Sequence, residues 1–197
     1  MTKYIYEDGL ETERLIARKL VFEDYKPWTA FYADPEAVEY FPDFGSVSDE
    51  EKARQWVERQ LKRYEEQRYG LQALFDKKTG AFIGQCGLLT QEVDGITELE
   101  VGYHVFRKFW GQGYATEAAK RFKEYGFANN LAESIISIID IRNTRSQNVA
   151  VKNGMTREKQ STWWGLNVYI YRVEKKQKAS HLNLHPGIAD SPPGPLS

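Results

Sequence analysis

Cysteine is almost absent from this chain, and histidine is scarce. Cys86 is the only cysteine among 197 residues, so no disulfide can form within the chain and no zinc site can be built from cysteines. The three histidines, His104, His181 and His185, are scattered along the chain. Their spacing predicts no metal site, and we expect Cys86 to be a small buried hydrophobic residue.

Long apolar runs and an excess of one charge are also missing. The apolar runs fall far short of the roughly 20 residues that a membrane-spanning helix needs, and the acidic N-terminus lacks the apolar core of a signal peptide. The net charge is −1, from 27 basic and 28 acidic residues, which offers no positive surface for nucleic acid or an anionic membrane. We therefore expect a cytoplasmic protein that binds neither, as a monomer or a homodimer.

The composition changes near the C-terminus. Four of the seven prolines follow Gln177, and the chain ends in SPPGPLS. Such a segment buries too little apolar surface to order itself. We expect residues 1–177 to form one domain and residues 178–197 to be a Pro-rich, disordered tail.

The first half of the domain shows one strand, several helices and then three strands. Alternating apolar and polar residues predict strands over 13–20, 69–76, 81–93 and 96–106. Asp94-Gly95 between the last two runs is typical of a hairpin turn, so residues 69–106 predict an antiparallel meander. Two short helical pieces, separated at Asp34-Pro35, precede a longer helix. Ser48 and Glu51 form a capping box that opens this helix, and we expect it to end near Arg68.

The second half predicts a crossover between two parallel strands. Residues 134–141, SIISIIDI, are almost continuously apolar, which is typical of a strand covered on both faces. An amphipathic helix from Ala115 to Gly126 precedes this strand, so the strands at its two ends are expected to run parallel. A short helix over 143–153, closed by Gly154, and two final strands over 155–164 and 167–176 complete the prediction.

Two glycines one residue apart stand immediately before the amphipathic helix, within Trp110 to Ala115. One interpretation is a tight turn, because glycine adopts conformations that strain other residues. The other is a cradle for phosphate, because main-chain N–H groups and the dipole at a helix N-terminus favour an anion. Nucleotide-binding motifs fit poorly: Thr116 stands where a dinucleotide fingerprint needs glycine, and the P-loop Gly-Lys-Ser/Thr is missing.

The same stretch resembles the pyrophosphate-binding motif of the GNAT N-acetyltransferases, Arg/Gln-x-x-Gly-x-Gly/Ala. Trp110 takes the place of the Arg or Gln, Gly113 that of the glycine, and Ala115 that of the last small residue. WGQGYATEA, with LEVGYHV, ETERLIARKL and NTRSQNVAVKNGM, resembles the branch of ribosomal-protein N-terminal acetyltransferases (RimJ/RimL-like). The resemblance covers roughly residues 10 to 175 and leaves out the tail.

The resemblance implies a fold and a reaction. The fold is α+β, with a central mixed, mostly antiparallel sheet flanked by helices, in which the fourth and fifth strands run parallel and splay apart. Acetyl-CoA enters the slot between them, and its acetyl group passes directly to a primary amine, which is either a protein N-terminal α-amine or a small molecule. The alternative is a non-catalytic acyl-CoA-binding or sensing module, since Trp110 departs from the family motif.

The resemblance also implies where the cofactor binds. The main chain of Tyr103, His104 and Val105 is expected to bond the pantetheine arm like an added strand, and the amides of the glycine loop to hold the pyrophosphate. The full set of implied cofactor-binding residues is Tyr103, His104, Val105, Trp110, Gly111, Gln112, Gly113, Tyr114, Ala115, Thr116, Asn143 and Ser146.

Glu100 is the candidate catalytic base. It lies on the strand face opposite Leu99 and Val101, either as a solvated surface carboxylate or, as the resemblance implies, as the group that removes the ammonium proton, directly or through water. A carboxylate partly desolvated by the slot would have a raised pKa. His104 shares the face of Glu100 but lies about 13 Å along a regular strand, so a direct dyad is not expected.

Asn143 and Ser146 form a second candidate cluster. Asn143 is a residue type favoured at a helix N-cap, and the resemblance implies a cofactor contact as well. Many family members place a tyrosine at the position of Ala150 to protonate the departing thiolate. Its absence moves that role to Ser146, or leaves the step to solvent.

The aromatic residues are expected to be core residues for the most part. Two segments stand where the resemblance implies the acceptor side of the slot. These are Phe41-Pro42-Asp43-Phe44 and Trp163-Trp164-Gly165.

Overall fold

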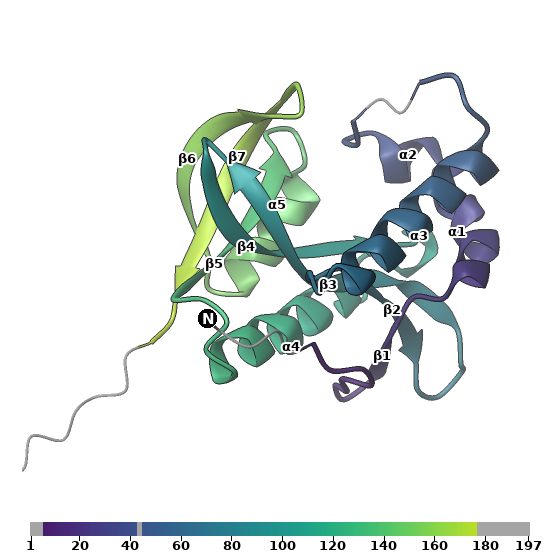
Figure 1. Ribbon diagram of the computed structural model, residues 1–197, viewed down its shortest axis with the longest axis horizontal. Coiled ribbons are helices and arrows are strands. Elements are labelled where there is room, and N and C mark those ends of the chain that lie inside the picture. Colours follow the sequence, from purple (N-terminus) through teal and green to yellow (C-terminus); the bar gives the residue numbers. More distant parts are fainter. Residues whose placement is uncertain (1–5, 43–44, 177–197) are drawn as a thin grey trace, which may run out of the picture.

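The computed structural model describes residues 6–42 and 45–176. One mixed sheet carries the fold, with strand order β1-β2-β3-β4-β5-β7-β6 (Figure 1). The expected tail over 178–197 lies outside the described residues, as do Asp43 and Phe44. The strands are β1 (Leu15–Lys19), β2 (Leu71–Asp76), β3 (Phe82–Val93), β4 (Ile96–Val105), β5 (Ser134–Asp140), β6 (Thr156–Trp163) and β7 (Leu166–Glu174).

The helices lie close to the ranges that the sequence predicts. They are α1 (Tyr25–Tyr32), α2 (Pro35–Val38), α3 (Asp49–Glu65), α4 (Tyr114–Ala128) and α5 (Thr144–Lys152), with short 3₁₀ turns at Phe22–Asp24 and Arg107–Phe109. As predicted, Ser48 caps α3 by accepting a hydrogen bond from the amide of Glu51 at 3.2 Å. The helix ends at Glu65, three residues before the predicted Arg68, because Gln67 turns the chain with φ of 54°.

The predicted sheet is confirmed in its topology. Strands β2, β3 and β4 form the antiparallel meander, and Asp94 and Gly95 take φ of 51° and 77° in the turn between β3 and β4. Strands β4 and β5 are the parallel pair, joined through α4, while β5, β7 and β6 are antiparallel. The whole is the α+β arrangement that the family resemblance implies.

Helices cover the two faces of the sheet unequally. Figure 1 shows α1, α2 and α3 gathered beside the half of the sheet that contains β1 to β4, while α4 lies against the sheet and α5 beside β5. Alternate residues of β4 point to opposite faces. Val101 and Val105 pack with Ala118 and Phe122 of α4, so Glu100 and His104 face the side of α1 and α3.

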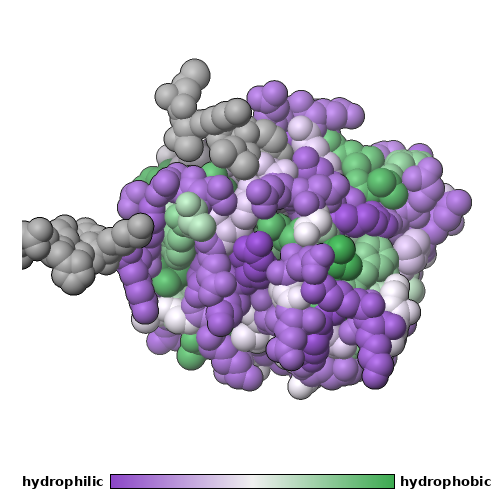
Figure 2. Space-filling view, turned by 90° about the horizontal axis from the view of Figure 1, so that it is seen from below, coloured by the Kyte–Doolittle hydropathy of each residue, from purple (hydrophilic) through white to green (hydrophobic). Residues whose placement is uncertain are grey.

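One face of the molecule is largely hydrophilic. Figure 2 shows one face on which hydrophilic residues predominate, with apolar residues in smaller areas between them. Cys86 is fully buried, as expected. No helix within residues 6–42 and 45–176 combines the length and the apolar character needed to cross a membrane.

Candidate functional site

Strands β4 and β5 separate after a single paired position. Glu100 of β4 pairs with Ile136 of β5. Both strands then continue, to Val105 and to Asp140, without pairing further with each other. A broken ladder leaves main-chain N–H and C=O groups that need other partners. A cavity of about 610 Å³ is lined by both strands along this opening.

The cavity is lined by residues of both faces of the sheet. On the side of α4 and α5 it reaches the glycine loop and Ser146, and on the side of α1 and α3 it reaches Trp56 and Arg63. Of the residues that the sequence implied for cofactor binding, all except Gln112 line it. The amide of the Gln112 side chain instead donates to the carbonyl of Lys108 at 3.1 Å.

The glycine loop leaves its amides unobstructed. Gly111 and Gly113 take φ of 73° and 83°, a left-handed conformation that costs other residues roughly 1–2 kcal/mol. A Cβ atom at Gly111 would meet no atom within 4 Å, and one at Gly113 only the guanidinium of Arg14, at 3.4 Å. The first amides of α4 have no intrahelical acceptor, as at every helix N-terminus. Gly113 at the N-cap has no side chain to accept from them. This arrangement suits an anion.

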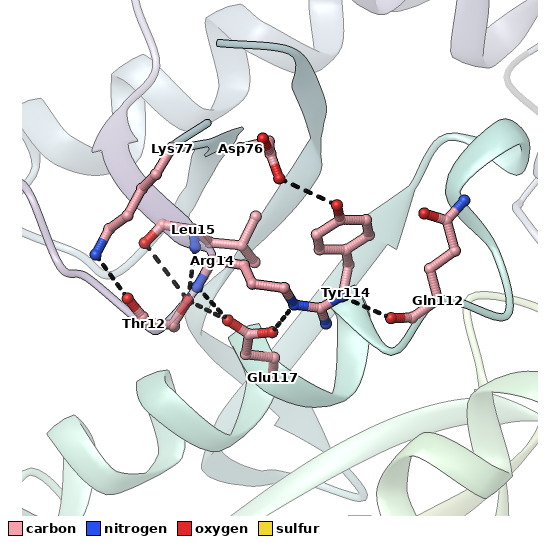
Figure 3. Close-up of polar contacts among 8 residues, drawn as sticks. All are labelled: Thr12, Arg14, Leu15, Asp76, Lys77, Gln112, Tyr114 and Glu117. Atoms are coloured by element: carbon pink, nitrogen blue, oxygen red, sulfur yellow. Dashed lines mark hydrogen bonds and ion pairs between the residues drawn. The ribbon is translucent and has the colours of Figure 1, made fainter. Parts of the chain in front are cut away.

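Side chains immediately before β1 and at the end of β2 hold the loop and the start of α4 from outside (Figure 3). Arg14 donates to the carboxylate of Glu117 at 2.6 Å and to the carbonyl of Gln112 at 2.9 Å. The phenol of Tyr114 donates to Asp76 at 3.1 Å. Sequence reasoning missed Arg14 as a positioning residue, because 103 residues separate it from Glu117 and no local pattern links them.

Trp110 has a definite place although it departs from the family motif. Its indole N–H donates to the carbonyl of Val105 at 2.7 Å, and the guanidinium of Arg145 lies 4.7 Å from the centre of its ring. The tryptophan therefore supplies a hydrogen bond to the end of β4, where the ladder with β5 is missing.

Glu100 is a buried carboxylate at the point where the strands separate. Its side chain accepts from the amide of the Gln91 side chain at 2.9 Å and from the main-chain N–H of Ile138 at 3.3 Å. Only 7% of the residue is exposed, which excludes the solvated surface carboxylate that the sequence left open. Burial raises the pKa of Glu100 above its ordinary value, although the two hydrogen bonds and the charge of Arg63 act in the opposite direction.

His104 belongs to an aromatic wall on the side of α1 and α3. Its ring centre lies 4.9 Å from that of Phe41, 5.3 Å from Trp56 and 6.2 Å from Phe31. Burial lowers the pKa of His104 to about 4, so the imidazole is neutral at physiological pH. The side chain thus faces the wall, while only its main chain lies beside the open edge of β4.

A pair of hydroxyl groups bridges β4 and α5. The phenol of Tyr103 donates to the carbonyl of Ser146 at 2.9 Å, and the Ser146 hydroxyl donates to the phenol oxygen at 3.1 Å. Asn143 caps α5 as predicted, since its side chain accepts from the amide of Ser146 at 3.0 Å. Ala150, where many family members have tyrosine, is fully buried in the core.

The phenol of Tyr103 is a group that sequence reasoning did not use. Strand alternation already places Tyr103 on the α4 and α5 face, with Val101 and Val105. That position was its only sequence signal, and it does not reveal the contact with Ser146. Burial raises the pKa of Tyr103, so the phenol keeps its proton at physiological pH.

The other end of the cavity combines aromatic and basic side chains. The predicted Phe41, Pro42, Trp163 and Trp164 all line it. Arg59 and Arg63 of α3 line it too, and no sequence pattern distinguishes them from the many other charged residues of that helix. In the part of the chain that the structure describes, no three His, Cys, Asp or Glu side chains gather as metal ligands.

Comparison with known proteins connects this geometry to a family. The family model described as Acetyltransferase (GNAT) domain matches residues 14–156. An uncharacterized protein of Bacillus subtilis, YkkB, is 34% identical over 167 residues, which are 82% of this chain and 93% of the relative. An uncharacterized N-acetyltransferase of Bacillus licheniformis, p20, is 28% identical and covers 87% of this chain and 99% of its own.

A solved structure shows the same fold. It is the ribosomal L7/L12 α-N-protein acetyltransferase RimL in complex with coenzyme A, with a TM-score of 0.69 and 14% identity, covering 85% of this chain and 98% of its own. At this identity the likeness concerns the fold alone.

We expect the pH dependence of stability to reveal the buried charge of Glu100. A carboxyl whose folded pKa is raised destabilises the folded protein once it ionises, so this cost is absent below the unfolded pKa and complete above the folded pKa. Glu100→Gln removes the charge while keeping an oxygen acceptor for Ile138. Its free energy of unfolding relative to the wild type should therefore increase as the pH rises from 4 to 7.5.

Urea denaturation of both proteins at several pH values measures this difference, with Glu92→Gln on the exposed end of β3 as the control. A difference that stays constant, or that decreases toward pH 7.5, would contradict the raised pKa.

Proposed function

The chain belongs to the GNAT acetyltransferase family, and we propose that it transfers the acetyl group of acetyl-CoA directly to a primary amine. Family membership makes it an acetyl-CoA-dependent acyltransferase, in line with the N-acetyltransferase name of the relative p20. Family membership thus favours an enzyme over the alternative, a non-catalytic sensing module. Direct transfer, the amine and the residue roles below are our proposals.

One observation carries the proposal: a single cavity connects the glycine loop with the buried Glu100. The loop offers unpaired amides at the N-terminus of α4, and Glu100 lies where β4 and β5 separate. A thioester held through its pyrophosphate at the first end would reach the carboxylate through the opening in the sheet. Phosphate binding at one end and a buried base at the other are what acetyl transfer to an amine requires.

The open edge of β4 suits the pantetheine arm. Unpaired main-chain groups of a strand edge bind an extended partner by hydrogen bonds, as in strand addition. We assign this role to the main chain of Tyr103, His104 and Val105, and the pyrophosphate to the amides from Gly111 to Thr116. Arg145 lies beside Trp110 and adds positive charge at this end, and Asn143 orients Ser146.

In the proposed reaction, Glu100 and the hydroxyl pair of Ser146 and Tyr103 transfer the protons. The amine nitrogen attacks the thioester carbonyl carbon, so a C–N bond forms and the C–S bond breaks. Glu100, its pKa raised by burial, accepts the ammonium proton directly or through a water molecule. The departing sulfur receives a proton from the hydroxyl pair of Ser146 and Tyr103, which lies on the side of α5. The second proton, which the nitrogen loses as the amide forms, restores the hydroxyl pair, and the proton on Glu100 passes to solvent.

The acceptor is either a protein N-terminal α-amine or a small-molecule amine. The motifs that resemble the RimJ/RimL branch favour the first. The sequence relatives carry no assigned substrate. A thiol-release assay with acetyl-CoA against a panel of N-terminal peptides, amino acids and polyamines tests the proposal. If no acceptor in the panel leads to release of CoA, the result would contradict the proposal.

We expect Gly113→Val to abolish tight binding of CoA. A β-branched side chain is strained at φ of 83° and would fill the space before the first amides of α4. Calorimetry with CoA should show an affinity loss of at least ~10²-fold, equivalent to about 2.7 kcal/mol.

The matched control is Gly154→Val, which has the same backbone strain at φ of 77° but lies outside the cavity. Both variants should lose similar stability, and only the first should lose CoA. Unchanged affinity in Gly113→Val would oppose the pyrophosphate assignment.

Glu100→Gln should preserve CoA binding and lower kcat by roughly 10²–10⁴, the usual contribution of a general base. The deficit should decrease as the pH rises, because an acceptor amine that is already deprotonated does not need the base. Steady-state rates between pH 6 and 10 measure this effect, and Glu92→Gln serves as the control. An active variant with the wild-type pH profile would show that the amine loses its proton to water instead.

Ser146→Ala should lower kcat roughly tenfold, less than Glu100→Gln does, with little change in the KM for acetyl-CoA. A thiolate leaves tolerably well without protonation, so this step needs less assistance. If the two hydroxyls act as one unit, Tyr103→Phe and the double variant should show a similar loss rather than a multiplied one. Thr144→Ala, which removes an exposed hydroxyl from the same helix, is the control. If the losses of the two single variants multiply in the double variant, the two hydroxyl groups act independently.

A further inference from the structure

The acceptor end of the cavity is the end lined by Phe41, Trp56 and Arg63. Among the described carboxylates that line the cavity, all but Glu100 have ion-pair partners. Glu36 forms an ion pair with Arg107 at 2.6 Å. Asp140 is bound by Arg142 in two hydrogen bonds of 2.9 Å each. Only Glu100, at the floor, lacks an ion pair among the described residues, because its partners are the uncharged Gln91 and a main-chain amide.

Arg63 is the cation on the opposite wall, and its charge is not matched. Its side chain donates weakly to the carbonyls of Tyr69 and Thr90, at 3.4 Å and 3.3 Å. No carboxylate within residues 6–42 and 45–176 approaches the guanidinium within 4.0 Å. Burial lowers the pKa of Arg63, as does the like charge of Arg68. A partly buried guanidinium without a counter-charge favours an anion.

Glu100 and Arg63 face the same space without meeting. Both line the cavity, and each charge shifts the pKa of the other, yet the two side chains form no ion pair. Arg59, one turn earlier on α3, lines the same wall. The acceptor space therefore has a negative floor and a positive wall.

We propose that the acceptor is a primary amine that also carries an anionic group, a carboxylate or a phosphate, which Arg63 binds while the amine lies at Glu100. The inference rests on the proposed function, because it names the acceptor class for that site. A zwitterionic acceptor fills the gap between the two charges and gives each an opposite partner. Arg63 is then a specificity-determining residue.

The charges of the wall also exclude a class of acceptor. A polyamine or an aminoglycoside would bring further positive charge to Arg63, and like charges repel. Aromatic, neutral side chains also line this space: Phe41, Trp56, Trp163 and the uncharged His104. An acceptor with an apolar or aromatic side chain suits these walls.

Matched acceptors test the charge requirement. L-phenylalanine is compared with L-phenylalaninamide, and 2-aminoethyl phosphate with ethanolamine, in the thiol-release assay, with spermidine as the polycation. The anionic member of at least one pair should have a kcat/KM about 10–100 times that of its neutral partner, as expected for a charge-assisted bond. The two pairs separate carboxylate from phosphate. Equal rates within both pairs, or a preference for spermidine, would overturn the proposal.

Variants of α3 test the assigned residue. Arg63→Gln should reduce the preference, because it raises KM for the anionic acceptor much more than KM for its neutral partner. Arg63→Lys should retain part of the preference, because the charge remains. Arg54→Gln, on an exposed part of α3 and outside the cavity, is the control. If Arg63→Gln lowers the rates for both acceptors equally, the residue only supports the fold.

A binding measurement decides the case in which no tested amine turns over. N-acetyl-L-phenylalanine and its amide are titrated into the protein saturated with CoA. Binding of the acid at least ~10-fold tighter than the amide, lost in Arg63→Gln, supports the anion site. Equal binding, or none, overturns it. Failure of CoA itself to bind would instead count against the proposed function.

Discussion

The opening between β4 and β5 is the constraint on which the rest of the structure depends. Two parallel strands that part after one paired position leave main-chain groups without a ladder, and buried groups of this kind must find other partners. Side chains provide them: Ser137 donates to the carbonyl of Val101 at 2.8 Å, Trp110 to that of Val105 at 2.7 Å, and Glu100 accepts from the N–H of Ile138. The slot persists because its edges are bonded to side chains rather than to each other.

We propose two roles for Glu100, one structural and one catalytic. It satisfies a main-chain amide of β5, and its burial raises its pKa toward the range that suits a base. The opposite charge of Arg63 remains apart from the Glu100 carboxylate, and we read that separation as space for the acceptor.

The two ends of the cavity are built by different physical means. At the cofactor end, glycine conformation and the N-terminus of α4 provide main-chain donors, and Arg14 and Glu117 hold the loop in place. At the acceptor end, side chains from α1, α3 and the β6–β7 hairpin form the walls. The first end is general for a pyrophosphate, whereas the second contains the residues that would distinguish one amine from another. Family membership follows from the first kind of feature, and the RimJ/RimL branch and the substrate remain proposals because they depend on the second.

Local sequence signals determined the elements and much of the cofactor end. The caps Ser48 and Asn143, the Asp94-Gly95 turn and the paired glycines act over a few residues, so a pattern reveals them, and the order of strands and helices predicted the crossover. Contacts between distant segments were decided only by tertiary structure: the anchoring of the loop by Arg14, the phenol of Tyr103 on Ser146, and Arg63 across from Glu100. Sequence left the exposure of Glu100 open, since alternation in a strand assigns a face but not what covers it. Burial and pKa belong to the packed molecule, because they depend on every segment that surrounds the group.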